Sequence, residues 1–380
     1  MARLSKLRAA LRPIKQKSQG RTDAKIILVA LFCSGGLSLS SLLSSRHPFE
    51  AELTVSTLSF TSSQKQLFLH EIPNLQEITL TGTHQIALTG QFESPDLPEL
   101  SQQTELTIDL GDQSAWTMIA PEDNPLILRS LHLGNNRIIN LTHNAPTHRL
   151  YFTLQPNSVK TRKTEPATLQ LQNPAAPVQL ILEQVTFPTL KTSSSIPDTI
   201  ELTYIPNTPL TVSLPHQGDF SATLTPPSDP KVASLESRYW IWGDLQVKDV
   251  NLTEIITIGN DLNSTKTAST IIQGTARLAD QNLDLKLGQY LLYESPGIQK
   301  LHDIQLDPTT SEFTVRLSGE TSQLKSGISR DRPLTTLRSN WLTNFVSEKG
   351  AIAILTFSTG LFSALLSWVI ANLITQPAEK

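Results

Sequence analysis

Histidine and carboxylate pairs are the residues of this sequence best suited to acid–base or metal chemistry. His143 and His148 lie on either side of Pro146, and His70 is followed directly by Glu71. A zinc or proton-transfer site needs further histidines or carboxylates close to such a pair. No Asp or Glu adjoins the two histidines, so we interpret them as loop or surface residues and His70–Glu71 as a chance pair.

Two aspartate pairs have a spacing of four residues, namely Asp280 with Asp284 and Asp303 with Asp307. On one face of an uninterrupted strand, such a pair could act as a general acid and a general base. Turn-forming residues lie beside both pairs, so a solvated loop edge is the better interpretation. The phosphate-binding loop, nucleophile-elbow and HExxH signatures are absent from the sequence. We therefore predict no catalytic, cofactor-binding or metal-binding residues and no enzyme.

The aromatic cluster Tyr239-Trp240-Ile241-Trp242 is the most informative point in the middle of the chain. Strand alternation would place Trp240 and Trp242 on one face and Tyr239 and Ile241 on the other. A buried tryptophan pair would belong to the core, whereas an exposed pair could bind a glycan, a peptide or a lipid. We favour the core and keep Trp240 and Trp242 as candidate ligand-binding residues.

Two apolar runs lie near the chain ends, and they would position the middle of the chain and any site in it. Residues 350–374 contain no Asp, Glu, Lys, Arg or His. A helix of this length reaches about 37 Å at ~1.5 Å per residue, and a hydrocarbon core is ~30 Å thick. This predicts a transmembrane helix over 350–374 with a short tail at 375–380, the alternative being a buried helix of a soluble domain.

The N-terminal region combines a basic arm at 1–25 with an apolar run at 26–44. We predict an uncleaved signal anchor over 26–44, and a cleaved signal peptide is the alternative. The positive-inside rule then places both chain ends in the cytoplasm, and the middle outside it, at the plasma (inner) membrane on the periplasmic side. The basic residues expected to meet anionic lipid are Arg3, Lys6, Arg8 and Arg12.

Small residues recur at intervals of four in both apolar runs, and such residues let helices approach closely. They are Gly36, Ser40, Gly360, Ser363, Ala364, Ser367 and Ala371. We predict that the two helices pack as a hairpin, while ordinary membrane composition would produce the same spacing.

The middle of the chain alternates between apolar and polar residues with the period of a strand, interrupted by turn signals. This predicts a mainly β fold, an antiparallel sandwich or jelly-roll-like body of one or two units flanked by two transmembrane helices. The expected parts are a β-body at 45–225, a Pro-rich linker or loop at 226–237 and a second β-body at 238–325. A single continuous body is also compatible with the pattern.

Residues 332–349 have apolar side chains spaced for a helix that begins at Pro333. We predict an interfacial amphipathic helix, with Trp341 and Phe345 at the membrane surface. The alternative is a helix packed beneath the β-body.

Composition limits the function classes. The net charge is -3 and the basic residues gather at the N-terminus, so the middle lacks the basic face of a nucleic-acid-binding protein. The single cysteine excludes disulfides within the chain. We predict a non-enzymatic, membrane-anchored envelope protein whose β-domain is a binding or scaffold module without a cofactor. Its expected partners are the lipid bilayer, another membrane or envelope protein, and a lipid or glycan. The alternatives are a lipid or glycolipid carrier with a β-groove, an accessory subunit of a transport or secretion complex, and a membrane-anchored hydrolase.

Overall fold

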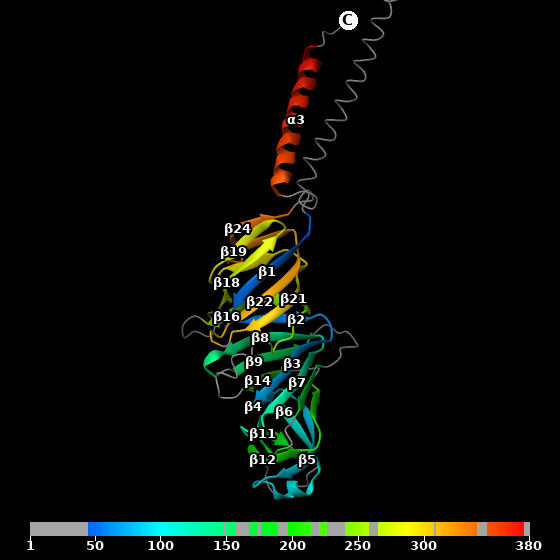
Figure 1. Ribbon diagram of the computed structural model, residues 1–380, viewed down its shortest axis with the longest axis vertical. Coiled ribbons are helices and arrows are strands. Elements are labelled where there is room, and N and C mark those ends of the chain that lie inside the picture. Colours follow the sequence, from blue (N-terminus) through cyan, green and yellow to red (C-terminus); the bar gives the residue numbers. More distant parts are fainter. Residues whose placement is uncertain are drawn as a thin grey trace, which may run out of the picture. The chain divides into compact units, whose positions relative to one another are not determined.

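The computed structural model describes ten stretches of the chain, which Figure 1 shows as ribbons. They are residues 45–147, 149–156, 167–172, 176–188, 197–213, 220–225, 240–257, 265–307, 309–339 and 348–375. Contacts divide the chain into two compact units. One is Pro48–Leu337, called the β-body below, and the other combines the described parts of Met1–His47 and Arg338–Lys380.

The β-body consists mainly of strands, which confirms the predicted mainly β fold. The first strands are β1 His47–Val55, β2 Leu58–Ser62, β3 Gln66–Leu75, β4 Glu77–Thr81, β5 Gln85–Glu93, β6 Glu105–Ile119, β7 Leu126–Leu133, β8 Asn136–Asn144, β9 Arg149–Pro156, β10 Thr168–Gln172, β11 Val178–Thr186 and β12 Thr199–Pro206. The later strands are β13 Leu210–Ser213, β14 Phe220–Thr225, β15 Leu245–Asn251, β16 Thr253–Thr257, β17 Thr265–Ser269, β18 Ile271–Leu278, β19 Gln281–Leu285, β20 Tyr290–Tyr293, β21 Gly297–Leu306, β22 Phe313–Thr321, β23 Gln323–Ser329 and β24 Arg332–Arg338. Two short 3-10 helices, η1 Pro98–Gln102 and η2 Ala145–Thr147, interrupt them.

Fifteen strands form one long sheet in the order β11-β12-β5-β6-β4-β14-β9-β8-β2-β15-β21-β22-β1-β18-β19. Neighbours such as β1 with β18 and β8 with β9 pair antiparallel, as predicted. Smaller sheets have the orders β13-β10-β7-β3, β16-β17 and β20-β23-β24. Within the β-body, β5, β11 and β12 lie near one end, and β18, β19 and β24 lie near the other (Figure 1).

The core follows from strand alternation. Along β1 the residues alternate between buried and exposed almost without exception, so Phe49, Leu53 and Val55 face inward. Inward residues of many strands join one hydrophobic cluster, and each contributes roughly 25 cal/mol per Å² of apolar surface removed from water. Phe68 is central to one region of this cluster, because its ring packs edge-on against Phe60 and Phe152 with centroids 6.0 and 5.8 Å away.

Strand β15 joins the two β-bodies that the sequence suggested. It pairs with β2 on one side, where Val247 lies opposite Ser62, and with β21 on the other, where Leu245 lies opposite Leu301. The contacts therefore group residues from before and after the predicted linker into one compact unit. The linker at 226–237 itself lies outside the described residues.

The predicted interfacial helix is wrong over Arg332–Arg338, because this segment is strand β24. Proline suits the first turn of a helix but is equally tolerated in an edge strand, where no ladder partner needs its N–H. Pro333 lies in such a strand, at the edge of the sheet β20-β23-β24. Trp341 and Phe345 lie outside the described residues.

The second unit contains helix α3, Glu348–Thr375, so a helix does form where the C-terminal apolar run predicted one. Within the part of the chain that the structure describes, no helix has both the length and the apolar character needed to cross a bilayer. The predicted pair of flanking transmembrane helices is therefore not supported. Hydroxyl residues, including Thr356, Thr359 and Ser363, interrupt the apolar side chains of α3.

The N-terminal arm and the first apolar run, with Arg3, Lys6, Arg8, Arg12, Gly36 and Ser40, lie outside the described residues. The first described residue is Ser45, which contacts Ser339 through two hydrogen bonds. The Ser45 amide donates to the Ser339 carbonyl at 3.5 Å, and the Ser339 hydroxyl donates to the Ser45 carbonyl. The two ends of the described β segment therefore meet.

Candidate functional site

The segment Trp240–Asp244 contributes to two candidate sites of the β-body, one around Trp242 and one around Asp244. Trp240 is buried, with 3% of its surface exposed, whereas Trp242 is 50% exposed. The two indoles therefore do not share the common environment that alternation predicted. The segment pairs with β3 only at the bridge between Ile241 and Leu69, where the His70 amide donates to the Trp240 carbonyl at 3.3 Å.

Trp242 is exposed but closely held. Its backbone amide donates to the carbonyl of Phe68 at 2.7 Å. The His70 ring meets the indole edge-on, with centroids 5.3 Å apart and planes at 79°. Gly243 follows, and a Cβ at that position would lie 2.3 Å from the His302 carbonyl oxygen, so only glycine permits this approach. These contacts fix an apolar ring at the surface, where it is available to a ligand.

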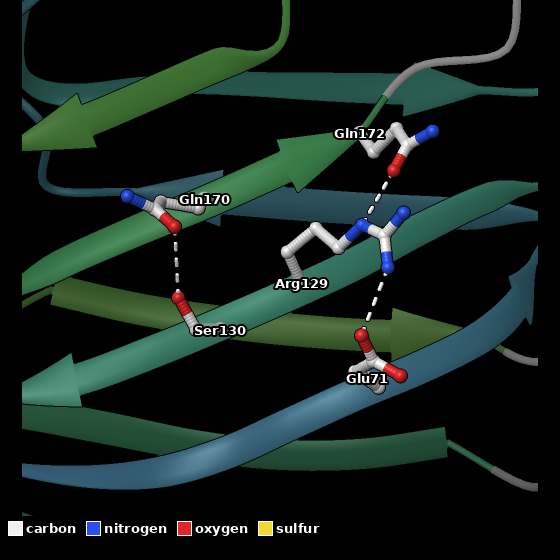
Figure 2. A network of polar contacts seen from close by, with 5 residues as sticks. All are labelled: Glu71, Arg129, Ser130, Gln170 and Gln172. Carbon is white, nitrogen blue, oxygen red and sulfur yellow. Dashed lines mark hydrogen bonds and ion pairs between the residues drawn. The ribbon is translucent and has the colours of Figure 1, made fainter.

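A polar network lies on the neighbouring strands β3, β7 and β10 (Figure 2). Arg129 is at its centre, with its Nη1 atom 2.9 Å from the Glu71 carboxylate and its Nε donating to the Gln172 amide oxygen. Beside it, the Ser130 hydroxyl donates to Gln170 at 3.1 Å. Figure 2 shows the guanidinium between Gln172 and Glu71, so its plane is fixed from both sides.

The residue that contacts the indole and the first residue of the polar network are neighbours on β3. His70, which contacts Trp242, precedes Glu71 and lies opposite Ser130 in the register of β3 with β7. We call Trp242, His70, Glu71, Arg129 and Gln172 the Trp242 surface. It combines an aromatic face with planar hydrogen-bonding groups. Because Glu71 already neutralises Arg129, the surface suits a neutral, hydroxyl-rich ligand better than an anion.

His132 lies on the same pair of strands, opposite Leu67. Partial burial lowers the pKa of His132, and the nearby positive charges of Lys65 and His70 lower it further. The imidazole is therefore neutral at physiological pH and can both donate and accept a hydrogen bond.

A second cluster brings together a carboxylate, an imidazole and a hydroxyl from three neighbouring strands. The His302 Nε2 atom lies 2.7 Å from Ser318 Oγ, and its Nδ1 atom lies 3.4 Å from Asp244 Oδ1. Asp244 immediately precedes β15, His302 is on β21 and Ser318 is on β22. Lys300 adds a contact of 2.9 Å to the same Asp244 oxygen.

Local backbone irregularities produce this alignment. The register of β21 with β22 shifts between Leu301 and Asp303, which makes His302 a bulge residue and redirects its side chain. Asp244 has φ of 60°, a left-handed conformation that is uncommon for a residue with a side chain. The hydrogen bond and positive charge of Lys300 lower the pKa of Asp244, with His302 contributing less, so this carboxylate is ionised at neutral pH.

An open hollow of about 440 Å³ lies beside the second cluster, on β1, β18, β19, β21 and β22. Its lining includes His302 from the cluster together with Arg277, Arg316, Glu52 and Asp284. A small molecule placed there would meet charges of both signs.

The residues singled out from the sequence are dispersed. His143 is buried in β8, and His148 lies outside the described residues. Asp280 is 3.9 Å from Arg277 at the surface, and Asp307 accepts hydrogen bonds from Thr309 within its own turn. Among the described residues, no three His, Cys, Asp or Glu side chains gather as metal ligands would.

The candidate helix-packing residues Gly360, Ser363, Ala364 and Ser367 lie on α3, and the side chain of Ala371 lies outside the described part. Their expected partner helix lies outside it as well, so helix pairing stays a prediction. Sequence reasoning missed Asp244, His302 and Ser318 because no short motif links them. It noted His70–Glu71, but no local signal connected that pair with Trp242.

Comparison with protein-family models, with curated proteins and with solved structures finds no match to this chain.

Proposed function

We propose that the protein is a membrane-anchored binding module of the cell envelope, with its ligand surface around Trp242. The observation that carries the binding role is an indole that is half exposed yet fixed by a hydrogen bond, an edge-on ring and a close backbone approach. Exposing a large apolar ring forgoes burial worth roughly 1.5–3 kcal/mol, a cost that a ligand can offset. The role requires no chemistry from the protein.

The ligand class we propose is a neutral glycan. The apolar face of a sugar ring packs on an indole, and its hydroxyl groups match amide, guanidinium and carboxylate partners. Arg129, Glu71 and Gln172 provide one group of each kind, already held in place by one another (Figure 2). Pre-ordered polar groups lose little entropy when a ligand binds.

Two observations support membrane anchoring by α3. Phe357 is 73% exposed, and Ile352 and Leu361 are also exposed. Phe357 and Leu361 are four residues apart and therefore share one face of α3, which an apolar environment would cover. The hydroxyls of Thr356 and Ser367 each donate at 2.8 Å to the carbonyl four residues earlier. Their hydrogen bonds are thus satisfied within the helix, as a hydrocarbon environment requires.

The sequence supports the orientation. Basic residues are concentrated before residue 26, and the positive-inside rule keeps such an arm in the cytoplasm. The β-body would then be extracytoplasmic, and its strands would form a sandwich or jelly-roll-like body. The lipid-carrier alternative is less favoured, because inward residues such as Leu53, Phe60 and Leu131 are fully buried against one another instead of lining a groove.

Fractionation and protease digestion test the anchoring. We expect the full chain to remain with membranes after a carbonate wash and to dissolve in detergent. Protease added to spheroplasts should degrade the β-body. Recovery in the aqueous fraction, or protection of the β-body from external protease, would contradict the proposal.

A glycan array tests the binding role, with the detergent-solubilised full chain as the probe. We expect neutral oligosaccharides to be retained and Trp242→Ala to lose them. Tyr151→Ala is the matched control, because Tyr151 is an exposed aromatic residue on β9, outside the Trp242 surface. Equal loss in both variants, or no retention by the unmodified chain, would contradict the assignment.

A further inference from the structure

We propose that Ser318 is a nucleophile for the hydrolysis of small acyl esters, with His302 as its general base and Asp244 as a positioning residue. The proposal goes beyond the binding role and does not depend on it. Its basis is the pair of contacts from His302, 2.7 Å to Ser318 Oγ and 3.4 Å to Asp244 Oδ1. A hydroxyl, an imidazole and a carboxylate in this order form the arrangement that activates serine nucleophiles on unrelated folds.

The backbone departs from regular geometry at the two residues that complete the alignment. A bulge in β21 turns His302 toward Ser318. Gly243 allows the chain to pass within reach of the His302 carbonyl, and the Asp244 amide donates to that carbonyl at 3.1 Å. Asp244 then takes a positive φ. Bulges and left-handed residues with side chains are concentrated near active sites, where surrounding contacts maintain them.

Lys300 supports the ionised form of the Asp244 carboxylate. It lies opposite Ser318 in the register of β21 with β22 and contacts Asp244 at 2.9 Å. Its hydrogen bond and charge lower the pKa of a carboxyl that is ionised at neutral pH, and an ionised Asp244 favours the His302 tautomer that has its proton on Nδ1. The Nε2 atom is then the acceptor that faces the serine hydroxyl.

The hollow next to His302 is lined by His302 and Arg316, while Ser318 lies outside its lining, and it indicates the substrate class. Arg316 is two residues from Ser318, so the two side chains point to the same face of β22. Its guanidinium can donate to the oxygen that becomes negative when an ester is attacked. The volume of about 440 Å³ and the open, charged lining suit a short acyl group on a polar alcohol.

The reaction consumes one ester and one water. The Ser318 oxygen bonds to the acyl carbon while His302 Nε2 takes the hydroxyl proton. The carbon–alkoxy bond then breaks, His302 returns the proton to the leaving alcohol, and an acyl-serine remains. Water attacks the acyl carbon as His302 takes its proton. The bond between that carbon and the Ser318 oxygen then breaks, His302 returns the proton to Ser318, and the carboxylic acid leaves.

Fluorophosphonate labelling of the detergent-solubilised full chain, followed by peptide mass spectrometry, tests the nucleophile. We expect one phosphonate adduct, on Ser318, and its loss in Ser318→Ala. His302→Ala should lower the labelling rate by about 100-fold. Ser101→Ala is the control, since the Ser101 hydroxyl donates to the carbonyl of Pro98 rather than to an imidazole. An unlabelled chain, or an adduct that persists in Ser318→Ala, would overturn the proposal.

Turnover of 4-nitrophenyl acetate tests the roles of the other residues. Asp244→Asn should reduce kcat by at least about 10-fold with little change in KM, and should shift the pH at which the rate is half-maximal. The charged groups that face His302 are Asp244, Lys300 and Arg316. Across the hollow lie Arg277, Glu50, Glu52 and Asp284. An unchanged pH profile in Asp244→Asn would contradict its positioning role, and full turnover in Ser318→Ala would contradict the mechanism. Ser101→Ala should leave turnover unchanged. The glycan test depends on Trp242 and the turnover test on Ser318, so either proposal can fail without the other.

Discussion

The imidazole of His70 meets the indole of Trp242 edge-on, with ring centroids 5.3 Å apart. This contact joins a residue of β3 to the segment before β15, and it supports an aromatic ring that is otherwise half in water. Edge-to-face pairs of this kind contribute roughly 0.5–1.5 kcal/mol beyond the area they bury.

Removing His70 should therefore weaken the Trp242 surface without removing its aromatic face. We expect His70→Ala to reduce glycan affinity by about 3- to 10-fold, which corresponds to the loss of that ring contact. Trp242→Ala should abolish detectable binding. Fluorine NMR of 5-fluorotryptophan-labelled protein would follow the order of the ring. An unaltered Trp242 resonance in His70→Ala would show that the histidine does not hold the indole.

Gly319 should tolerate no side chain. A Cβ there would lie 2.0 Å from the Gly297 carbonyl oxygen on the paired strand β21, so β21 and β22 would have to separate. We expect Gly319→Ala to lower the free energy of unfolding by at least about 2 kcal/mol, measured by urea denaturation. Gly111→Ala is the matched control, because its nearest neighbour would be Ser114 Oγ at 3.7 Å. Equal stability of the two variants would contradict the close packing of these strands.

Tyr293 should make the fold sensitive to alkaline pH. Burial raises the pKa of Tyr293 to about 12 from 10.0, and the negative charge of Asp249 adds to the shift. The folded state thus holds the phenol proton more tightly than the unfolded state. The contribution of Tyr293 is complete below pH 10 and is lost as the pH rises from 10 to about 12.

The size of that alkaline loss should be on the order of 2 kcal/mol. In Tyr293→Phe this pH-dependent part should disappear, while stability at pH 7 falls by about 1 kcal/mol because the hydroxyl no longer donates to the Val250 carbonyl. Tyr151→Phe, at an exposed tyrosine, is the control. Urea unfolding at several pH values would measure both effects, and identical alkaline profiles for wild type and Tyr293→Phe would contradict the assignment.

Lys300 should lower the pKa of Asp244. Its hydrogen bond and charge hold the pKa of that carboxyl below the ordinary value, so Lys300→Met should raise the pKa. Carbon-detected NMR titration of the Asp244 carboxyl would follow the change. Added salt should reduce the difference between the two proteins, because the carboxylate is exposed. Lys266→Met on β17 provides a control at a surface lysine that takes no part in this cluster.

Much of the strand content could be predicted because alternation is a local signal. The predicted second β-body contains two pairs of neighbouring strands, β18 with β19 and β21 with β22. Sheet order could not be predicted in the same way. The pairing of β15 with β2 depends on which distant edges are complementary, and no local pattern carries that information.

The Arg332–Arg338 error has a related cause. Leucines at intervals of three suit a helix, but the pairing available at the edge of the sheet β20-β23-β24 outweighs that preference. The second candidate site escaped prediction because a bulge and a left-handed residue, rather than a motif, bring Asp244 and His302 together.

The contact between Ser45 and Ser339 has a mechanical consequence. A force that separates the residues before Ser45 from those after Ser339 would first load the two hydrogen bonds between these serines. The strands between them would be loaded only after those bonds break. Tension between the flanking segments would therefore leave the folded strands unloaded until the Ser45–Ser339 contact breaks.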